Sequence, residues 1–164
     1  MINLPEISNL ELQKLQVPGG WSVTINRFYA LDPDEDLAGR QLSHIDPATV
    51  NDPWDDVLLT YFDSSCLWLA IRGDNRFQIS LEWAPMGDRD GRYWFQQHSA
   101  TAVKFSHPPA RRLTRKRDDI VVTYKLDAPV TWADEPDRTL ESRDRQLVAS
   151  TLNLWLDECS RIWP

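Results

Sequence analysis

Residues 77–83 read Phe-Gln-Ile-Ser-Leu-Glu-Trp, with apolar and polar side chains in strict alternation. Successive side chains of a β-strand point to opposite sides of the sheet, so this period of two predicts a strand with one buried face. Before it, Cys66–Ile71 is apolar throughout, which predicts a strand covered on both sides. After it, Arg92–His98 places Tyr93 and Phe95 on one face. Three short strands joined by turns predict an antiparallel meander.

Further strands are expected outside this meander. Trp21–Asn26 alternates and continues into Phe28 and Tyr29, and Asp119–Leu126 alternates near the other end of the chain. Val103 and Phe105 would form an edge strand. Residues 4–16 have mixed apolar spacing that is compatible with a short helix.

Two helices are predicted with more definite signals. Asp52-Pro53 is a typical helix start, because the carboxylate accepts bonds from free N–H groups and proline fits the first turn. Apolar residues at helical spacing follow, which predicts a short helix over 53–62. A Pro/Asp-rich linker from Ala128 to Arg138 leads to a long C-terminal helix that begins near Thr139 or Ser142.

These elements predict an α+β fold. We expect a mainly antiparallel, five- to six-stranded sheet with a short helix at 53–62 and a long C-terminal helix packed on one face. The chain has 164 residues, which favours a single α+β domain over residues 1–164.

The net charge of −7 is unevenly distributed along the chain. Residues 1–65 hold eleven acids and three bases, a net of −8, whereas residues 66–164 hold fifteen bases and fourteen acids. Charge segregation of this kind bears on partners and solubility, not on the fold.

Motifs for catalysis or for cofactors are absent from the sequence. The stretch Asp32-x-Asp34-x-Asp36 resembles the start of a calcium loop, but Leu37 replaces the required glycine and Ser43 the closing glutamate. The histidines are scattered, and neither a hydrolase elbow nor a glycine-rich phosphate loop is present. We therefore expect no catalytic residue, no cofactor and no metal, with an enzyme of unknown chemistry as an alternative.

An acidic surface is the main functional feature that the sequence offers. Acids precede and begin the 53–62 helix, with an aromatic residue among them, and aromatic side chains beside charge are favoured at protein interfaces. Such a surface suits a basic protein partner, or serves solubility alone. The predicted partner-binding residues are Asp32, Asp34, Glu35, Asp36, Asp52, Trp54, Asp55 and Asp56.

A basic segment supports a different function. Five bases crowd into positions 111–117, and exposed aromatic residues of the sheet would offer stacking surfaces, so nucleic-acid binding is an alternative. Against it, Asp118 and Asp119 follow immediately, and the chain is acidic overall. The five bases are Arg111, Arg112, Arg115, Lys116 and Arg117.

The sequence favours a soluble cytoplasmic protein. The first residues lack the basic and apolar regions of a secretory signal, and the longest apolar run, Cys66–Ile71, is far shorter than the ~20 residues of a membrane span. Cys66 and Cys159 both lie in apolar patterns and are expected to be buried, reduced thiols.

The segment Trp54–Gln97, roughly a quarter of the chain, resembles bacterial toxin-immunity proteins, particularly those of contact-dependent growth inhibition. The resemblance lies in composition and element order: a helix is followed by an apolar strand, an alternating strand and an aromatic strand. It implies stoichiometric binding of a cognate toxin, often a nuclease, by an acidic surface that stands in for nucleic-acid phosphates. The stretches concerned are Trp54-Asp-Asp-Val-Leu-Leu, Leu67-Trp-Leu-Ala-Ile71, Phe77–Trp83 and Tyr93-Trp-Phe95.

Overall fold

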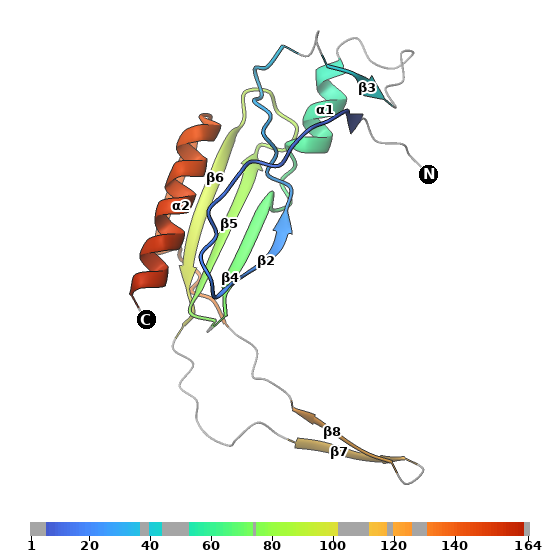
Figure 1. Ribbon diagram of the computed structural model, residues 1–164, viewed down its shortest axis with the longest axis vertical. Helices are drawn as coiled ribbons and strands as arrows, with labels where there is room; N and C mark the ends of the chain where they lie inside the picture. The colour runs from blue at the N-terminus through green and yellow to red at the C-terminus, as the bar shows by residue number, and fades with distance from the viewer. Residues whose placement is uncertain are drawn as a thin grey trace.

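The computed structural model contains a five-stranded antiparallel sheet in the order β2-β4-β5-β6-β9 (Figure 1). The strands are β2 (Trp21–Asn26), β4 (Trp68–Arg72), β5 (Phe77–Ala84), β6 (Arg92–Ser99) and β9 (Arg138–Ser142). The structure describes residues 6–36, 40–43, 53–73, 75–101, 112–117, 120–125 and 131–162, with the backbone alone for 53, 54, 56, 112–117 and 120–125. The predicted α+β class with a mainly antiparallel sheet is confirmed.

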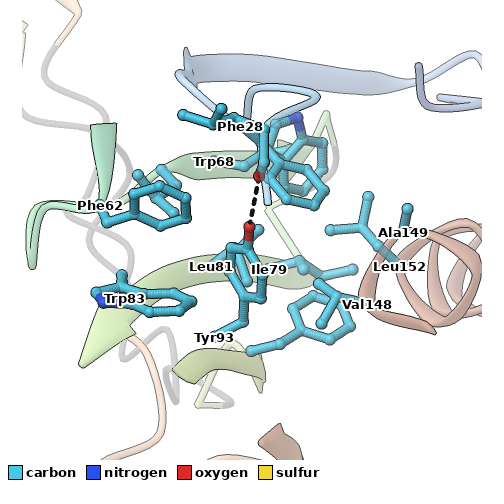
Figure 2. Close-up of a cluster of buried hydrophobic side chains, with 14 of the residues drawn as sticks. Phe28, Phe62, Trp68, Ile79, Leu81, Trp83, Tyr93, Val148, Ala149 and Leu152 are labelled. Carbon is cyan, nitrogen blue, oxygen red and sulfur yellow. Dashed lines mark hydrogen bonds between the residues drawn. The ribbon is translucent and has the colours of Figure 1, made fainter. Parts of the chain in front are cut away.

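Both helices lie on the same face of the sheet. Helix α1 (Pro53–Tyr61) and helix α2 (Arg145–Arg161) contribute buried side chains to the core that β5 and β6 form. Alternate residues of these strands point into that core, and Phe95 stacks on Trp155 of α2 with ring centroids 4.2 Å apart. Figure 2 shows how tightly the aromatic side chains gather there, with the Tyr93 hydroxyl donating to the Leu31 carbonyl oxygen.

The N-terminal segment completes this packed face. It begins with β1 (Glu6–Ile7), which pairs with β3 (Leu42–Ser43), and then crosses the sheet toward β2 (Figure 1). The backbone N–H of Gln16 donates to Asn153 Oδ1 at 2.8 Å, and Trp21 Nε1 donates to Ser160 Oγ at 2.9 Å. The segment therefore contacts α2 from Gln13 to Trp21. It contains turns and bridges but no helix, so the helix expected within 4–16 is wrong for the described part of that range.

The strand content of the second half differs from the sequence prediction. The strand expected at 119–126 exists as β8 (Ile120–Lys125), but it pairs with β7 (Arg112–Arg117) in a separate hairpin instead of joining the sheet. The fifth strand of the sheet is β9, which covers residues that we assigned to the linker and to the helix start. Val103 and Phe105, the expected edge strand, lie outside the described residues.

The hairpin is inserted between two neighbouring strands of the sheet. Its stem is closed by a bridge between Ala100 and Trp132 and by the N–H of Thr101, which donates to the Thr131 carbonyl oxygen at 2.9 Å. The chain therefore leaves β6 and returns toward β9 at one place.

The C-terminal helix begins later than Thr139 or Ser142. Asp144 is its N-cap, and the carboxylate accepts hydrogen bonds from the N–H groups of Gln146 and Leu147. Two such bonds satisfy donors that the first turn leaves free, which fixes the start at Arg145. The short helix begins at Pro53 as predicted and ends at Tyr61.

Candidate partner-binding surfaces

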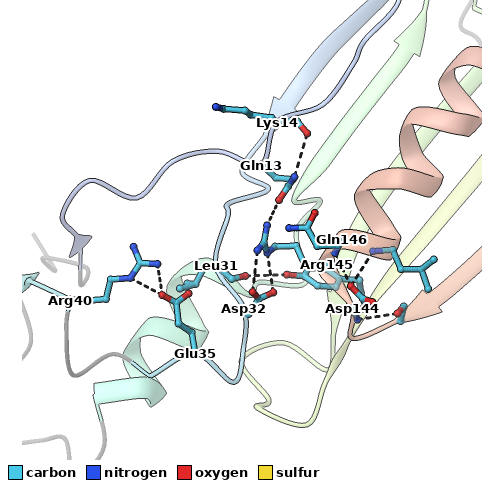
Figure 3. Close-up of polar contacts among 12 residues, drawn as sticks. Gln13, Lys14, Leu31, Asp32, Glu35, Arg40, Asp144, Arg145 and Gln146 are labelled. Atoms are coloured by element: carbon cyan, nitrogen blue, oxygen red, sulfur yellow. Dashed lines mark hydrogen bonds and ion pairs between the residues drawn. The ribbon is translucent and has the colours of Figure 1, made fainter.

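Asp32, the first of the predicted acidic residues, is bound within the chain. Its Oδ1 lies 2.9 Å from Nε of Arg145, at the start of α2, and its Oδ2 lies 3.1 Å from Nη2 (Figure 3). The Arg145 side chain is only 12% exposed and also donates to Gln13. The hydrogen bonds that Arg145 donates to the Asp32 carboxylate raise the pKa of Arg145, which keeps this guanidinium charged.

The next two acids are paired in the same way. Both carboxylate oxygens of Asp34 accept from Arg143 Nη2 at 3.0 Å, and Glu35 Oε1 accepts from Arg40 Nε at 2.8 Å. Arg143 also donates to the Arg89 and Gly91 carbonyl oxygens in the turn after β5. The acidic loop is therefore tied to the start of α2 through Arg145 and to this turn through Arg143, and three arginines neutralise much of its local charge.

Burial beneath this loop affects Tyr93. Desolvation, followed by the negative charge of Asp32, raises the pKa of the Tyr93 phenol. The phenol stays neutral at physiological pH and remains a hydrogen-bond donor to Leu31.

The remaining predicted residues belong to α1 and to the segment before it. Asp55 is exposed on α1, and Asp36 is also engaged within the chain. Trp54 and Asp56 lie in α1, where the backbone alone is described, and Asp52 lies outside the described residues.

The second face of the sheet carries a group of side chains that the sequence reasoning did not combine. Glu82 of β5, Trp94 of β6 and Glu141 of β9 are direct cross-strand partners, so their side chains project from the same face in one row. Trp94 is 41% exposed, although it lies between the buried Tyr93 and Phe95. The alternation of β5 and β6 signals that Glu82 and Trp94 point away from the core. The sequence does not place Glu141 on this face, because Arg138–Ser142 has a single apolar residue and so lacks the alternation typical of a strand.

This row of three side chains, the Glu82–Trp94–Glu141 row, has two further neighbours. The thiol of Cys66 lies 3.7 Å from Glu82 Oε1. Burial raises the pKa of this thiol, and the nearby Glu82 carboxylate raises it further. On the other side, Arg92 Nη1 lies 3.8 Å from Glu141 Oε2, and both side chains are more than half exposed. A pair this long and this exposed is weak.

The two cysteines thus differ in position. Cys159 is buried in α2, as expected, and burial raises the pKa of its thiol. Cys66 is only partly buried, near the second face of the sheet, which differs from the expected full burial.

The basic segment is part of a strand. Arg112–Arg117 forms β7, and each of its residues is paired antiparallel with β8. Arg111, the first base of the predicted segment, lies outside the described residues.

Comparison of the chain with protein families, with curated proteins and with solved structures finds no match. Within the part of the chain that the structure describes, neither helix has the length and apolar character needed to cross a membrane.

Proposed function

We propose that this protein is a stoichiometric binder that neutralises a basic protein partner in the bacterial cytoplasm, in the manner of a toxin-immunity protein. The observation that carries the proposal is the Glu82–Trp94–Glu141 row on the sheet face opposite both helices. Exposed tryptophan is a frequent hot-spot residue at interfaces, and flanking carboxylates favour a cationic partner.

The charge distribution supports the same proposal. Residues 102–130 hold seven bases and three acids, which leaves eleven bases against twenty-two acids in the rest of the chain. An excess of eleven negative charges would speed the approach of a basic protein, most strongly at low salt.

The acidic residues predicted from sequence keep a place in the proposal, with unequal weights. Asp52, Trp54, Asp55 and Asp56 form its second contact region, at and before the start of α1. The acids of the loop at 32–35 contribute less directly, because arginines of the same chain already neutralise them.

A direct test uses the product of the neighbouring gene as the partner. We expect a 1:1 complex by calorimetry, an affinity that falls as salt rises, and protection of cells when the two proteins are co-expressed. Absence of binding at low salt together with absence of protection would overturn the proposal.

Charge reversal locates the contact within this test. Asp55→Lys is expected to weaken the complex, since it places a repulsive charge on α1. Glu135→Lys is the matched control, because Glu135 is also exposed but lies in the segment before β9. Equal effects of the two variants would point to general electrostatics instead of the α1 contact.

Nucleic-acid binding is the second candidate function. The observation that favours it is that the basic segment forms a two-stranded antiparallel hairpin outside the main sheet, and a β-ribbon of this kind fits the major groove. Binding to a DNA duplex at about 50 mM salt, weakening steeply as salt rises, is the expected result. A flat titration at that salt concentration would remove this candidate.

A further inference from the structure

We infer that the Glu82–Trp94–Glu141 row is a receptor for a single arginine side chain of the basic partner. The inference rests on the proposed function and deepens it, because it names the chemical group that the open sheet face recognises. The guanidinium would lie over the Trp94 ring, with a carboxylate on each side.

Strand register supplies the geometry of this receptor. Glu82 and Glu141 pair with Trp94 from the two neighbouring strands, so each carboxylate is attached one strand spacing, about 4.7–4.9 Å, from the strand that carries the indole. A guanidinium is planar and has five N–H donors, so one group can stack on the ring and donate sideways to both carboxylates.

The packed face contains the same combination in completed form. The guanidinium carbon of Arg138 lies 4.4 Å from the centroid of the Trp155 ring, while Nη1 of Arg138 donates to Glu158 at 2.5 Å. There a tryptophan and a carboxylate hold an arginine of the same chain. At Trp94 the tryptophan has two carboxylates beside it, and we assign the arginine to the partner.

Arg92 occupies the edge of the receptor without blocking it. It pairs with Glu141 at 3.8 Å through a highly exposed side chain, so an incoming arginine displaces a weak contact. Glu82 accepts only the weak thiol donor of Cys66 at 3.7 Å among the bonds described for it, and keeps oxygen lone pairs for a stronger donor. The same two carboxylates repel phosphate, which separates this surface from a base-stacking platform.

A hexa-arginine peptide is the probe, and the indole N–H signal of Trp94 in a nitrogen–proton correlation spectrum is the readout. The signal is assigned by its loss in Trp94→Leu. At about 20 mM salt we expect it to shift on titration, and to shift less at about 200 mM. A Trp94 signal that stays still while other signals move would overturn the inference.

Variants test each part of the receptor by affinity for the peptide. We expect Trp94→Leu to bind the peptide about fivefold more weakly. The double variant Glu82→Gln/Glu141→Gln should lose affinity by a similar factor. Glu135→Gln, which neutralises an exposed carboxylate elsewhere, is the single-site control. The control for the double variant is Glu135→Gln combined with Glu11→Gln, which also removes two exposed carboxylates. Losses no greater than those of these controls would also overturn the inference. Thermal unfolding of each variant verifies that it is folded.

The failure of this inference and the failure of the proposed function have different signatures. If the peptide shifts Trp94 but the neighbouring gene product does not bind, the receptor stands and the assigned function fails. If that product binds equally well to wild type and to Trp94→Leu, and the peptide leaves the Trp94 signal still, the function stands and the receptor fails.

Discussion

The two faces of the five-stranded sheet are made by alternate residues of the same strands, yet their side chains differ in burial and in polarity. Phe95 is 0% exposed and stacks on a helix, while its neighbour Trp94 is 41% exposed on the other side. The packed face is filled by two helices and the N-terminal segment. On the open face, β5 and β6 carry carboxylate, amide and imidazole groups around the exposed Trp94 indole, while β4 adds the partly buried Leu69 and Ile71. One face therefore carries the core of the fold, and the receptor that we propose lies on the other.

The largest expected difference between the two faces is tested by truncating two neighbouring aromatic residues. Phe95→Ala should lower the free energy of unfolding by about 3–5 kcal/mol, because it removes a ring stacked in the core. Trp94→Ala should lower it by less than about 1 kcal/mol. Denaturant unfolding measures both, and comparable losses would mean that the open face is structurally required.

The turn after β5 shows how closely the packed face is filled. A Cβ added at Gly91 would lie 2.8 Å from Cε2 of the buried Trp83 and 2.9 Å from the Asp88 carbonyl oxygen. Gly91→Ala should therefore lower the free energy of unfolding by about 1–3 kcal/mol. Gly19→Ala is the control, since nothing lies within 4 Å of its added Cβ. Chemical denaturation measures both variants. An equal fall in the denaturant midpoint of the two variants would contradict tight packing at Gly91.

Ion pairs on the two faces should also differ. A double-mutant cycle on Asp32 and Arg145 should give a coupling energy of about 1 kcal/mol, since the arginine is mostly buried and binds both carboxylate oxygens. The same cycle on Arg92 and Glu141 should give about 0.3 kcal/mol or less. A larger coupling energy for Arg92 and Glu141 than for Asp32 and Arg145 would show that solvent exposure does not determine the strength of these ion pairs.

The smallest effect concerns thiol chemistry at the open face. Only the thiolate reacts with disulfide reagents. Burial, followed by the Glu82 carboxylate, raises the pKa of the Cys66 thiol, so the native thiol reacts slowly at pH 8. Glu82→Gln lowers that pKa and should move the pH profile of labelling to lower pH, with a modest gain in rate at pH 8. Glu135→Gln should leave the profile unchanged. An unmoved profile in Glu82→Gln would mean that this carboxylate does not act on Cys66.

Much of the fold is predictable because its signals are local. The alternation in Phe77–Trp83 and the apolar stripe of α2 identify the central strand and the covering helix without knowledge of the rest. Strand β9 is not predictable from the sequence, because Arg138–Ser142 has one apolar residue, Leu140. As an edge strand with one solvated face, β9 requires few apolar side chains. The exclusion of β8 from the sheet follows from pairing, which alternation alone does not specify.

The candidate site was less accessible to sequence reasoning. Acidic residues at 32–35 are visible in the sequence, but two of their arginine partners lie more than one hundred positions away. Long-range pairing of this kind depends on the folded chain. The Glu82–Trp94–Glu141 row needs three strands in register, of which only two were recognised.

The bridge between Ala100 and Trp132 holds the two ends of the segment 102–130 together, so we expect that this segment can be exchanged or shortened. A chain that departs and returns at one place can be rejoined there by a short turn, and closing a loop of about 4 residues instead of 29 spares about 2 kcal/mol of chain entropy. The exchange also removes seven bases and three acids. Insertion or loss of this one segment would let evolution retune the electrostatic character of the whole molecule without altering its core.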